Sequence, residues 1–251
     1  MKNIKVYINA KRLCLLFLLI LLAGTVSYAK KPKVLIFSKT AGFKHGSIPK
    51  GIIAIQKLGA ENKFDVDTTT DVKNFNPDFL KKYKAVIFLS PTGSVFNNKQ
   101  KDAFQKYIQK GGGFVGIHSA TDFEYNWPWY GRLVGAYFSG HPHQQVATIR
   151  VLNAQHISTK HLPNPWVRKD EWYNFRSVSK DIQVLLDLDE STYDAGKNKM
   201  GSSHPIAWYH DFEGGRSFYT GLGHTDESYE EPLFLQHLLG GILYASKISK
   251  R

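Results

Sequence analysis

The sequence predicts an α/β fold with a mostly parallel central sheet, and three observations support this prediction. Short, continuously apolar runs alternate with segments whose apolar residues recur at helical spacing. Continuous apolar runs are typical of strands that are covered on both faces. Several of these runs end at polar side chains, as strands do where an open α/β sheet forms its ligand crevice.

The alternation is most regular between residues 33 and 120. Buried strands are expected at 33–38, 85–90 and 114–117, with a weaker strand at 64–70. Helices are expected at 48–62, at 76–83 and from Asn97 or Asn98 to residue 110, because proline or asparagine stands at each start. This order predicts parallel strands that are joined by right-handed crossovers.

The second half of the chain has a less regular pattern. Strands are expected at 144–152 and 182–188, and a hairpin at 204–222 that turns at Glu213-Gly214-Gly215. An aromatic loop with a short helix is expected at 124–134, and a loop-rich segment at 156–176. The final helix is expected at 232–244, where Pro232 marks its start.

Residues 1–29 are typical of a signal peptide. Four basic residues precede an apolar run at 13–23, and Ser27-Tyr28-Ala29 is suited to cleavage. An uncleaved membrane anchor is the alternative, but the apolar run is short for a membrane span. We expect an exported protein, periplasmic or secreted, with one domain at 30–251 and no stable membrane anchor. Cys14 is the only cysteine, so the mature chain would have neither a disulfide nor a thiol nucleophile.

The charge and the missing motifs exclude several classes of partner. The net charge is +12, or 12 − 4 = +8 without the four basic residues near the start. The lysines are scattered, which indicates a solvated surface rather than a nucleic-acid site. No Gly-x-Gly-x-x-Gly follows the first strand and no Walker loop is present, so no nucleotide cofactor is expected. Gly-x-Ser-x-Gly is also absent, which argues against an α/β-hydrolase elbow.

Four of the ten histidines lie in loops that carry glycine or other polar residues: His45, His118, His141 and His224. A single loop histidine often has only a surface or capping role. Several that meet at one edge of the sheet could act as acids, bases or metal ligands. We take His118, His224, Asp122 and Glu171 as candidate catalytic residues.

A divalent metal is a further possibility. Neutral imidazoles together with a carboxylate suit Zn, Fe or Mn. The candidate ligands are His118, His141 and His224, although no closely spaced motif such as His-Glu-x-x-His is present.

Aromatic side chains crowd the same loops and are typical of sugar sites. The candidate substrate-binding residues are His45, Ser119, Trp127, His141, Trp172 and Tyr173. The alternative, which has equal weight, is that the aromatic residues cap the core over the edge of the sheet.

Several motifs together resemble the ThuA-like (trehalose utilisation) family, over residues 33–246. They are Gly42-Phe43-Lys44-His45, the stretch 111–122, Asp170-Glu171-Trp172-Tyr173, His204-Pro205-Ile206-Ala207-Trp208 and the stretch 214–224. The resemblance implies a flavodoxin-like, three-layer sandwich similar to class I glutamine amidotransferases. In those enzymes the nucleophilic cysteine follows a strand that ends in Gly-Ile. Here His118 follows Gly116-Ile117, which indicates that amidotransferase activity is absent.

The resemblance also implies a role in carbohydrate metabolism, with trehalose or a related glycoside or keto-glycoside as the small-molecule partner. A hydrolase, a lyase and an isomerase all remain open. The alternatives are a non-catalytic sugar-binding module that has lost the nucleophile, and a scaffold protein. The sequence makes no prediction of the oligomeric state.

Overall fold

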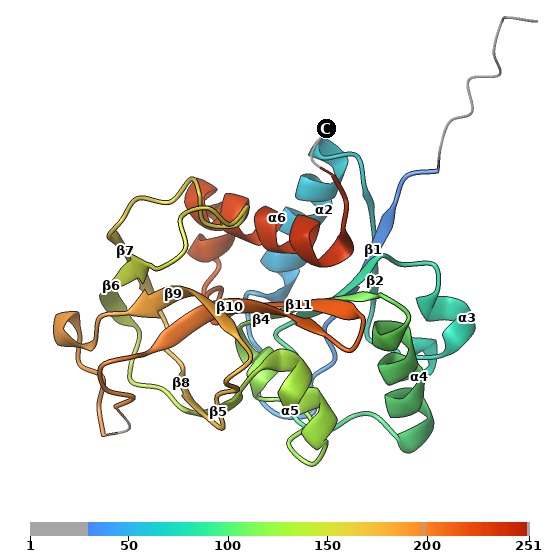
Figure 1. Cartoon of the computed structure of the whole chain (residues 1–251), viewed down its shortest axis with the longest axis horizontal. Coiled ribbons are helices and arrows are strands. Elements are labelled where there is room, and N and C mark those ends of the chain that lie inside the picture. Colours follow the sequence, from blue (N-terminus) through green and yellow to red (C-terminus); the bar gives the residue numbers. More distant parts are fainter. Residues whose placement is uncertain (1–29, 198, 250–251) are drawn as a thin grey trace, which may run out of the picture. The chain divides into compact units, whose positions relative to one another are not determined.

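Nine strands form the central sheet of the protein (Figure 1). The computed structural model describes residues 30–197 and 199–249. In sheet order the strands are β2 (Asp65–Thr69), β1 (Lys33–Phe37), β3 (Ala85–Leu89), β4 (Gly113–Ile117), β11 (Gly215–Thr220), β10 (Pro205–Phe212), β9 (Gln183–Leu188), β6 (Gln145–Val151) and β7 (Trp166–Asp170). Two short strands, β5 (Tyr137–Gly140) and β8 (Asn174–Arg176), pair with each other in a separate sheet.

The direction of the strands determines which loops share an edge. Strands β2, β1, β3, β4 and β11 are all parallel. From β11 onward, each neighbouring pair up to β7 is antiparallel. Each antiparallel pair reverses the strand direction. Strand β9 is two pairs away from β11 and β7 is four pairs away, so both run in the same direction as β11. The carboxyl ends of β1, β3, β4, β11, β9 and β7 therefore lie at one edge, and the predicted α/β class with a mostly parallel sheet is confirmed.

Five helices lie against this sheet (Figure 1): α2 (Ile48–Glu61), α3 (Pro77–Leu80), α4 (Asn98–Gln109), α5 (Pro128–Val134) and α6 (Pro232–Ser246). The view in Figure 1 draws α2 and α6 on one side of the sheet and α3, α4 and α5 on the other. Of the two predicted caps of helix α4, Asn97 is the one observed: its side chain and that of Gln100 cap each other's backbone N–H groups. Gly241 lets α6 pack closely on β11, because a Cβ there would lie 2.2 Å from the Phe218 ring.

The core explains why the first strands are continuously apolar. Every residue of β3 and β4 is buried, since both strands lie inside the sheet with helices over them. Phe88 of β3 packs against Phe37 of β1 at 5.2 Å between ring centroids, and stacks on Phe104 of α4 at the same distance. Strands β3 and β4 are therefore fixed by packing on both faces of the sheet.

Strands β5, β7 and β8 lie in segments for which the sequence predicted no strand. In β7 the buried side chains are Trp166, Arg168 and Asp170, and the exposed ones are Val167 and Lys169. Two of the three inward positions are charged and an outward one is apolar. The alternation of burial is regular, but it is invisible to a hydrophobic pattern.

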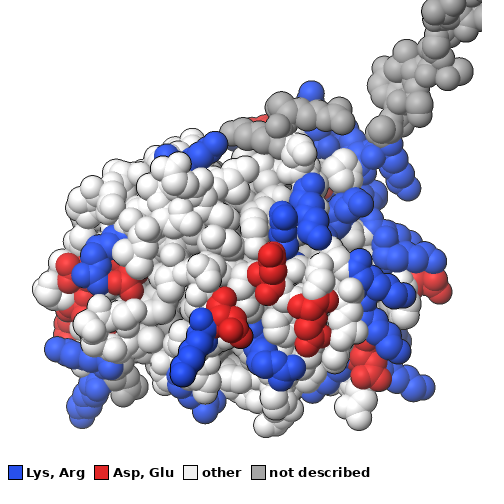
Figure 2. Space-filling model, in the orientation of Figure 1, with Lys and Arg blue, Asp and Glu red and all other residues white. Residues whose placement is uncertain are grey.

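The proposed signal peptide at 1–29 lies outside the described residues. Residues from Lys31 onward form one compact unit. Among the described residues no helix is both long enough and apolar enough to cross a membrane. Lys and Arg side chains on the face drawn in Figure 2 are dispersed, with Asp and Glu side chains between many of them.

Candidate metal centre at the carboxyl edge of the sheet

Four ionisable side chains converge at the carboxyl edge of the sheet: His45, His118, Glu171 and His224. One potential ligand atom from each lies within 4.8 Å of those from the other three. His45 lies in the loop after β1, and His118, Glu171 and His224 follow β4, β7 and β11. The group therefore forms because four strands that point the same way deliver their next residues to one place. We call these four residues the metal-ligand group.

His118 is fixed in position by its backbone and by its ring. Its φ of +51° is unusual for a residue with a side chain, and such strain recurs at functional sites. The Tyr219 hydroxyl donates a hydrogen bond of 2.7 Å to the carbonyl of His118. The Nδ1 atom of His118 lies 2.9 Å from the carbonyl oxygen of Gly221, which can only accept, so Nδ1 carries the hydrogen. When the ring is neutral, it presents the lone pair of Nε2 to the rest of the group.

That lone pair faces two further ligand atoms at short range. Nε2 of His118 lies 3.0 Å from Nδ1 of His224 and 3.4 Å from Oε2 of Glu171. Nδ1 of His224 lies 3.0 Å from the same Oε2. Ligand atoms bound at 2.0–2.2 Å to one ion lie about 2.9–3.6 Å apart, depending on the coordination geometry. The spacing of these three atoms therefore fits a single divalent ion.

For His45 and Glu171 the electrostatics favour protonation states that a metal ion could use. Burial lowers the pKa of His45 to about 3, and the charges of His118 and His224 act in the same direction. At neutral pH the His45 ring is therefore uncharged. Burial raises the pKa of Glu171, but hydrogen bonds to His118 and His224 and their positive charges outweigh it, and the net shift is downward. Glu171 is therefore a carboxylate.

His224 is more basic than an ordinary histidine because of Glu171. Burial lowers its pKa, but the hydrogen bond to Glu171 and the charges of Glu171 and Asp170 more than offset that effect. The net pKa of His224 is raised. A hydrogen on Nδ1 of His224 would face two acceptors, Oε2 of Glu171 and Nε2 of His118. An incoming cation would replace that proton.

The other predicted site residues line the margin of the group. His141, which we expected to be a metal ligand, is not a member: its Nδ1 lies 3.3 Å from Oε1 of Glu171, and its side chain is 41% exposed. Its ring stacks on Tyr173, which in turn lies 4.2 Å from the His118 ring. His45, which we expected only to bind substrate, takes the fourth position in the group.

Ser119 and Asp122 follow His118 in the chain. The Ser119 hydroxyl is buried and lies 3.4 Å from Nδ1 of His45. Asp122 accepts a 2.6 Å hydrogen bond from the Tyr125 hydroxyl. Burial raises the pKa of Asp122, against the opposing effects of Tyr125 and of the charge on His118. Asp122 is a carboxyl group near the metal-ligand group but outside it.

The two tryptophans do not present an open face to a ligand. Trp172 is fully buried, and its Nε1 donates to the carbonyl of Gln145 at 2.9 Å. Trp127 is also buried and stacks on Trp129 with ring centroids 5.1 Å apart. Both side chains belong to the core, which was the alternative for the aromatic residues.

The exposed aromatic side chain beside the group is Phe43, which the sequence reasoning did not select. Phe43 is 66% exposed and its ring centroid lies 4.9 Å from that of His45. Thr92 holds the backbone beneath it: its hydroxyl donates to the Phe43 carbonyl at 2.8 Å and accepts from the Gly42 N–H at 3.2 Å. The available signal was its position two residues before His45 in a glycine-led loop.

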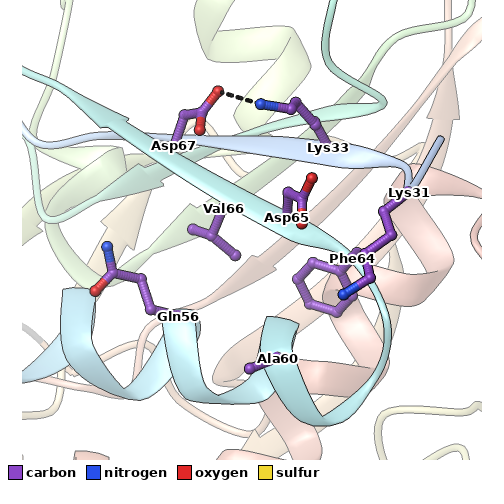
Figure 3. A pocket seen from close by; sticks show the side chains of 8 residues that line it. All are labelled: Lys31, Lys33, Gln56, Ala60, Phe64, Asp65, Val66 and Asp67. Carbon is purple, nitrogen blue, oxygen red and sulfur yellow. Dashed lines mark hydrogen bonds and ion pairs between the residues drawn. The ribbon is translucent and has the colours of Figure 1, made fainter.

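A separate hollow of about 420 Å³ lies at the start of β1 and β2 (Figure 3). It is lined by Lys31, Lys33, Gln56, Ala60, Phe64, Asp65, Val66 and Asp67. The ammonium group of Lys33 pairs with Asp67 at 3.2 Å. Because these strands begin here and end at the metal-ligand group, the hollow is not part of the candidate site.

The chain matches the family model ThuA, described as trehalose utilisation, over residues 33–245. No functionally curated protein matches it. Among solved structures, a ThuA-like protein from Bacteroides uniformis is 28% identical, with a TM-score of 0.73, and the match covers 88% of this chain and 95% of that one. A ThuA-like protein from Parabacteroides merdae is 22% identical, with a TM-score of 0.71 and coverage of 87% and 90%.

The fold alone extends to more distant structures. A β-galactosidase from Bacillus circulans is 15% identical, with a TM-score of 0.56. That match covers 90% of this chain but 32% of the larger protein.

Proposed function

This chain belongs to the ThuA (trehalose utilisation) family, and we propose that it is an exported protein of carbohydrate metabolism with a divalent metal centre. In this proposal His45, His118, Glu171 and His224 hold the ion, and a glycoside or keto-glycoside binds beside it. Amidotransferase chemistry is not part of the proposal, because His118 follows the Gly116-Ile117 strand end where the nucleophilic cysteine would be expected. We also take the fold to be the flavodoxin-like three-layer sandwich, which the helices on both sides of the sheet support.

One observation carries the metal proposal: the convergence of three imidazoles and one carboxylate in a mostly buried group. Potential ligand atoms of three of its members lie 3.0 to 3.4 Å apart. Buried polar atoms in such an arrangement are costly unless they are satisfied. A donor set of three histidines and a glutamate suits Zn, Fe or Mn.

A bound divalent ion would polarise an oxygen of the substrate or of a water molecule. The residues around it have separate tasks. His118 would be oriented by its Nδ1–H bond to Gly221. Asp122, whose pKa burial raises, is a candidate acid or base outside the ligand set. Elimination or isomerisation would require Asp122 to remove a C–H proton of the sugar, whereas hydrolysis would require it to donate a proton to the leaving oxygen while water attacks the anomeric carbon.

The sugar part of the proposal rests on the family and on Phe43. The family description is trehalose utilisation. An exposed aromatic ring beside a polar group of this kind can pack on the C–H face of a pyranose. Trp127 and Trp172, which are buried, no longer contribute to this argument.

Export is supported by the pattern of residues 1–29, in which basic residues, an apolar run and small residues follow in order. N-terminal sequencing of the protein from a cell fraction outside the cytoplasm tests it. A mature terminus at Lys30 is expected. An intact Met1 in the cytoplasmic fraction would overturn it.

Elemental analysis of the purified protein tests the metal centre. About one equivalent of Zn, Fe or Mn per chain is expected, and H118A should lose it. His143 offers a matched control, because it is an exposed histidine two residues from His141 and outside the metal-ligand group. H143A should keep the metal. Equal metal contents in H118A and wild type would contradict the proposal.

Calorimetry with trehalose and its 3-keto form, followed by mass spectrometry of the products, tests the sugar activity. Turnover that is lost in H118A supports an enzyme. Saturable binding without any product would favour the non-catalytic sugar-binding module. In the binding experiment F43A should weaken affinity about tenfold and F43W should retain it, consistent with the energy of one aromatic contact. I53A is the control, because it also removes an exposed apolar side chain, on α2, and it should leave the affinity unchanged.

A further inference from the structure

The buried carboxylate of Asp170 joins two segments that supply metal ligands. Its Oδ1 accepts hydrogen bonds from the backbone N–H of Glu171 at 2.9 Å and of His224 at 3.2 Å. Its Oδ2 accepts from the N–H of Gly223 at 3.0 Å. One side chain thus holds the backbone of two members of the metal-ligand group.

The sheet itself does not fix the distance between these two ligands. Glu171 follows β7 and His224 follows β11, and the strands β10, β9 and β6 lie between them in the sheet. By contrast, His118 follows β4, which pairs directly with β11. The 3.0 Å separation between Glu171 and His224 therefore depends on a contact outside the ladder of strand hydrogen bonds. The described structure provides that contact at Asp170.

Asp170 is itself held by Arg168 on the same face of β7. The Nη1 atom of Arg168 donates to Oδ2 of Asp170 at 2.7 Å, and both side chains are almost completely buried. Nη2 of Arg168 donates to the Ser228 hydroxyl at 3.0 Å, and Nε donates to Glu231 at 2.9 Å. The guanidinium also lies over the ring of Trp166, 5.1 Å from its centroid. These contacts balance the charge of Asp170 and fix its orientation.

We infer that Asp170, oriented by Arg168, is a positioning residue that fixes the distance between Glu171 and His224 and thereby sets the affinity of the metal centre. This inference rests on the proposed metal function. Asp170 touches no ligand atom in the group, and acts through the backbone of the two ligands. Outer partners that orient metal ligands typically change affinity by about 10- to 100-fold when they are altered.

Asp170→Asn is the most direct variant. Asparagine keeps the shape, but its amide group donates where one carboxylate oxygen accepted, so at least one backbone N–H at Glu171, Gly223 or His224 loses its partner. Asp187 provides the matched control. It is also buried, accepts from the backbone N–H of His204 at 2.7 Å and pairs with Arg150, but it holds no member of the metal-ligand group.

The experiment measures Zn²⁺ affinity of the full protein by competition with a chromophoric chelator, and the absorption of the Co²⁺-substituted protein. D170N should bind Zn²⁺ about 10- to 100-fold more weakly and shift the Co²⁺ bands. D187N should lose stability as well but keep both metal readouts within about twofold of wild type. If D170N and D187N gave equal affinities and equal spectra, Asp170 would be only structural and the inference would be overturned.

Arg168 gives a second test. R168M removes the partner that orients Asp170, and R168K keeps a positive charge there. R168M should weaken Zn²⁺ binding, and R168K should restore part of the loss. Equal affinity of R168M and wild type would contradict the role of Arg168.

A metal-independent measurement separates failure of this inference from failure of the proposed function. If the wild type binds no metal, the proposed metal centre is excluded. NMR of the histidine rings without metal then decides on Asp170: altered His224 ring nitrogen shifts in D170N but not in D187N support its positioning role. Unchanged His224 shifts in D170N would overturn it.

Discussion

Buried histidines of this protein belong to two groups that differ in their chemistry. His45 and His118 lie at the carboxyl edge of the sheet and His237 lies in helix α6, and all three are buried. His237 satisfies both ring nitrogens locally: Nδ1 donates to the Ser158 carbonyl at 2.9 Å and Nε2 accepts from the Thr220 hydroxyl at 3.2 Å. At the edge, the second nitrogen of His118 instead faces another ionisable side chain.

The comparison teaches that burial does not identify a functional histidine. Burial lowers the pKa of both His45 and His237 to about 3. His210 is a further structural case: its Nε2–H is donated to the Leu133 carbonyl at 2.8 Å, and its Nδ1 has no hydrogen-bond partner among the described residues. The informative feature is the partner of the remaining nitrogen: a neutral hydroxyl leaves the ring satisfied, whereas a converging carboxylate and imidazole create a place for a cation.

The largest effect is expected when the edge group loses His118. H118A removes a ligand whose tautomer is fixed by Gly221, so Zn²⁺ affinity should fall by more than about 100-fold, since the loss of an outer partner alone costs 10- to 100-fold. Chelator competition measures it. H210A, from the structural group, should keep wild-type affinity in its folded fraction. A tenfold or larger loss in H210A would erase the distinction between the two groups.

Loss of the structural histidine His237 should reduce stability but leave the metal content unchanged. H237L leaves the Ser158 carbonyl and the Thr220 hydroxyl without partners, and should lower the free energy of unfolding by about 3 kcal/mol. Metal content per folded chain should not change. Urea unfolding at pH 7 gives the first quantity and elemental analysis the second. A stable H237L that had lost its metal would show that α6 takes part in the site.

The buried, neutral ring of His237 also determines how acid should change the stability of the protein. The pKa of His237 is lowered to about 3, below its unfolded value of about 6.5, so the unfolded chain binds the additional proton between these values. Stability therefore falls as pH drops below 6.5, and His237 alone should contribute a loss of about 2 kcal/mol between pH 7 and pH 5. Urea unfolding across this range should give a shallower pH dependence for H237L. Identical slopes in both proteins would mean that His237 is not buried as a neutral ring.

The sequence predicted most of the strands and helices because those segments bury mainly apolar side chains or carry ordinary caps. It also predicted that His45 and His118 could meet, since both follow strands of a parallel sheet. It could not predict β7, whose inward side chains include Arg168 and Asp170. Glu171 was selected as a candidate catalytic residue, but without β7 the strand pattern did not show how reversals of strand direction bring it to the same edge.

The choice between His45 and His141 as the fourth ligand was also outside the reach of sequence patterns. Both residues lie in polar loops, and His141 is closer in sequence to a second histidine. The structure separates them by burial and distance, because His45 is enclosed by the rings of His118 and His224, at 4.7 and 5.2 Å between centroids. His141 lies on the outer oxygen of Glu171.

This difference gives the smallest predicted effect. H141Q removes a partly exposed contact to Oε1 of Glu171, worth about 0.6 kcal/mol, so Zn²⁺ affinity should fall only about threefold. His143 is an exposed histidine in the same loop and lacks that contact, so H143Q should have no effect on Zn²⁺ affinity. Both are measured by chelator competition at 0.1 M salt. A loss in H141Q as large as that in H118A would place His141 among the ligands, because a contact that is open to solvent and only orients the carboxylate cannot account for it.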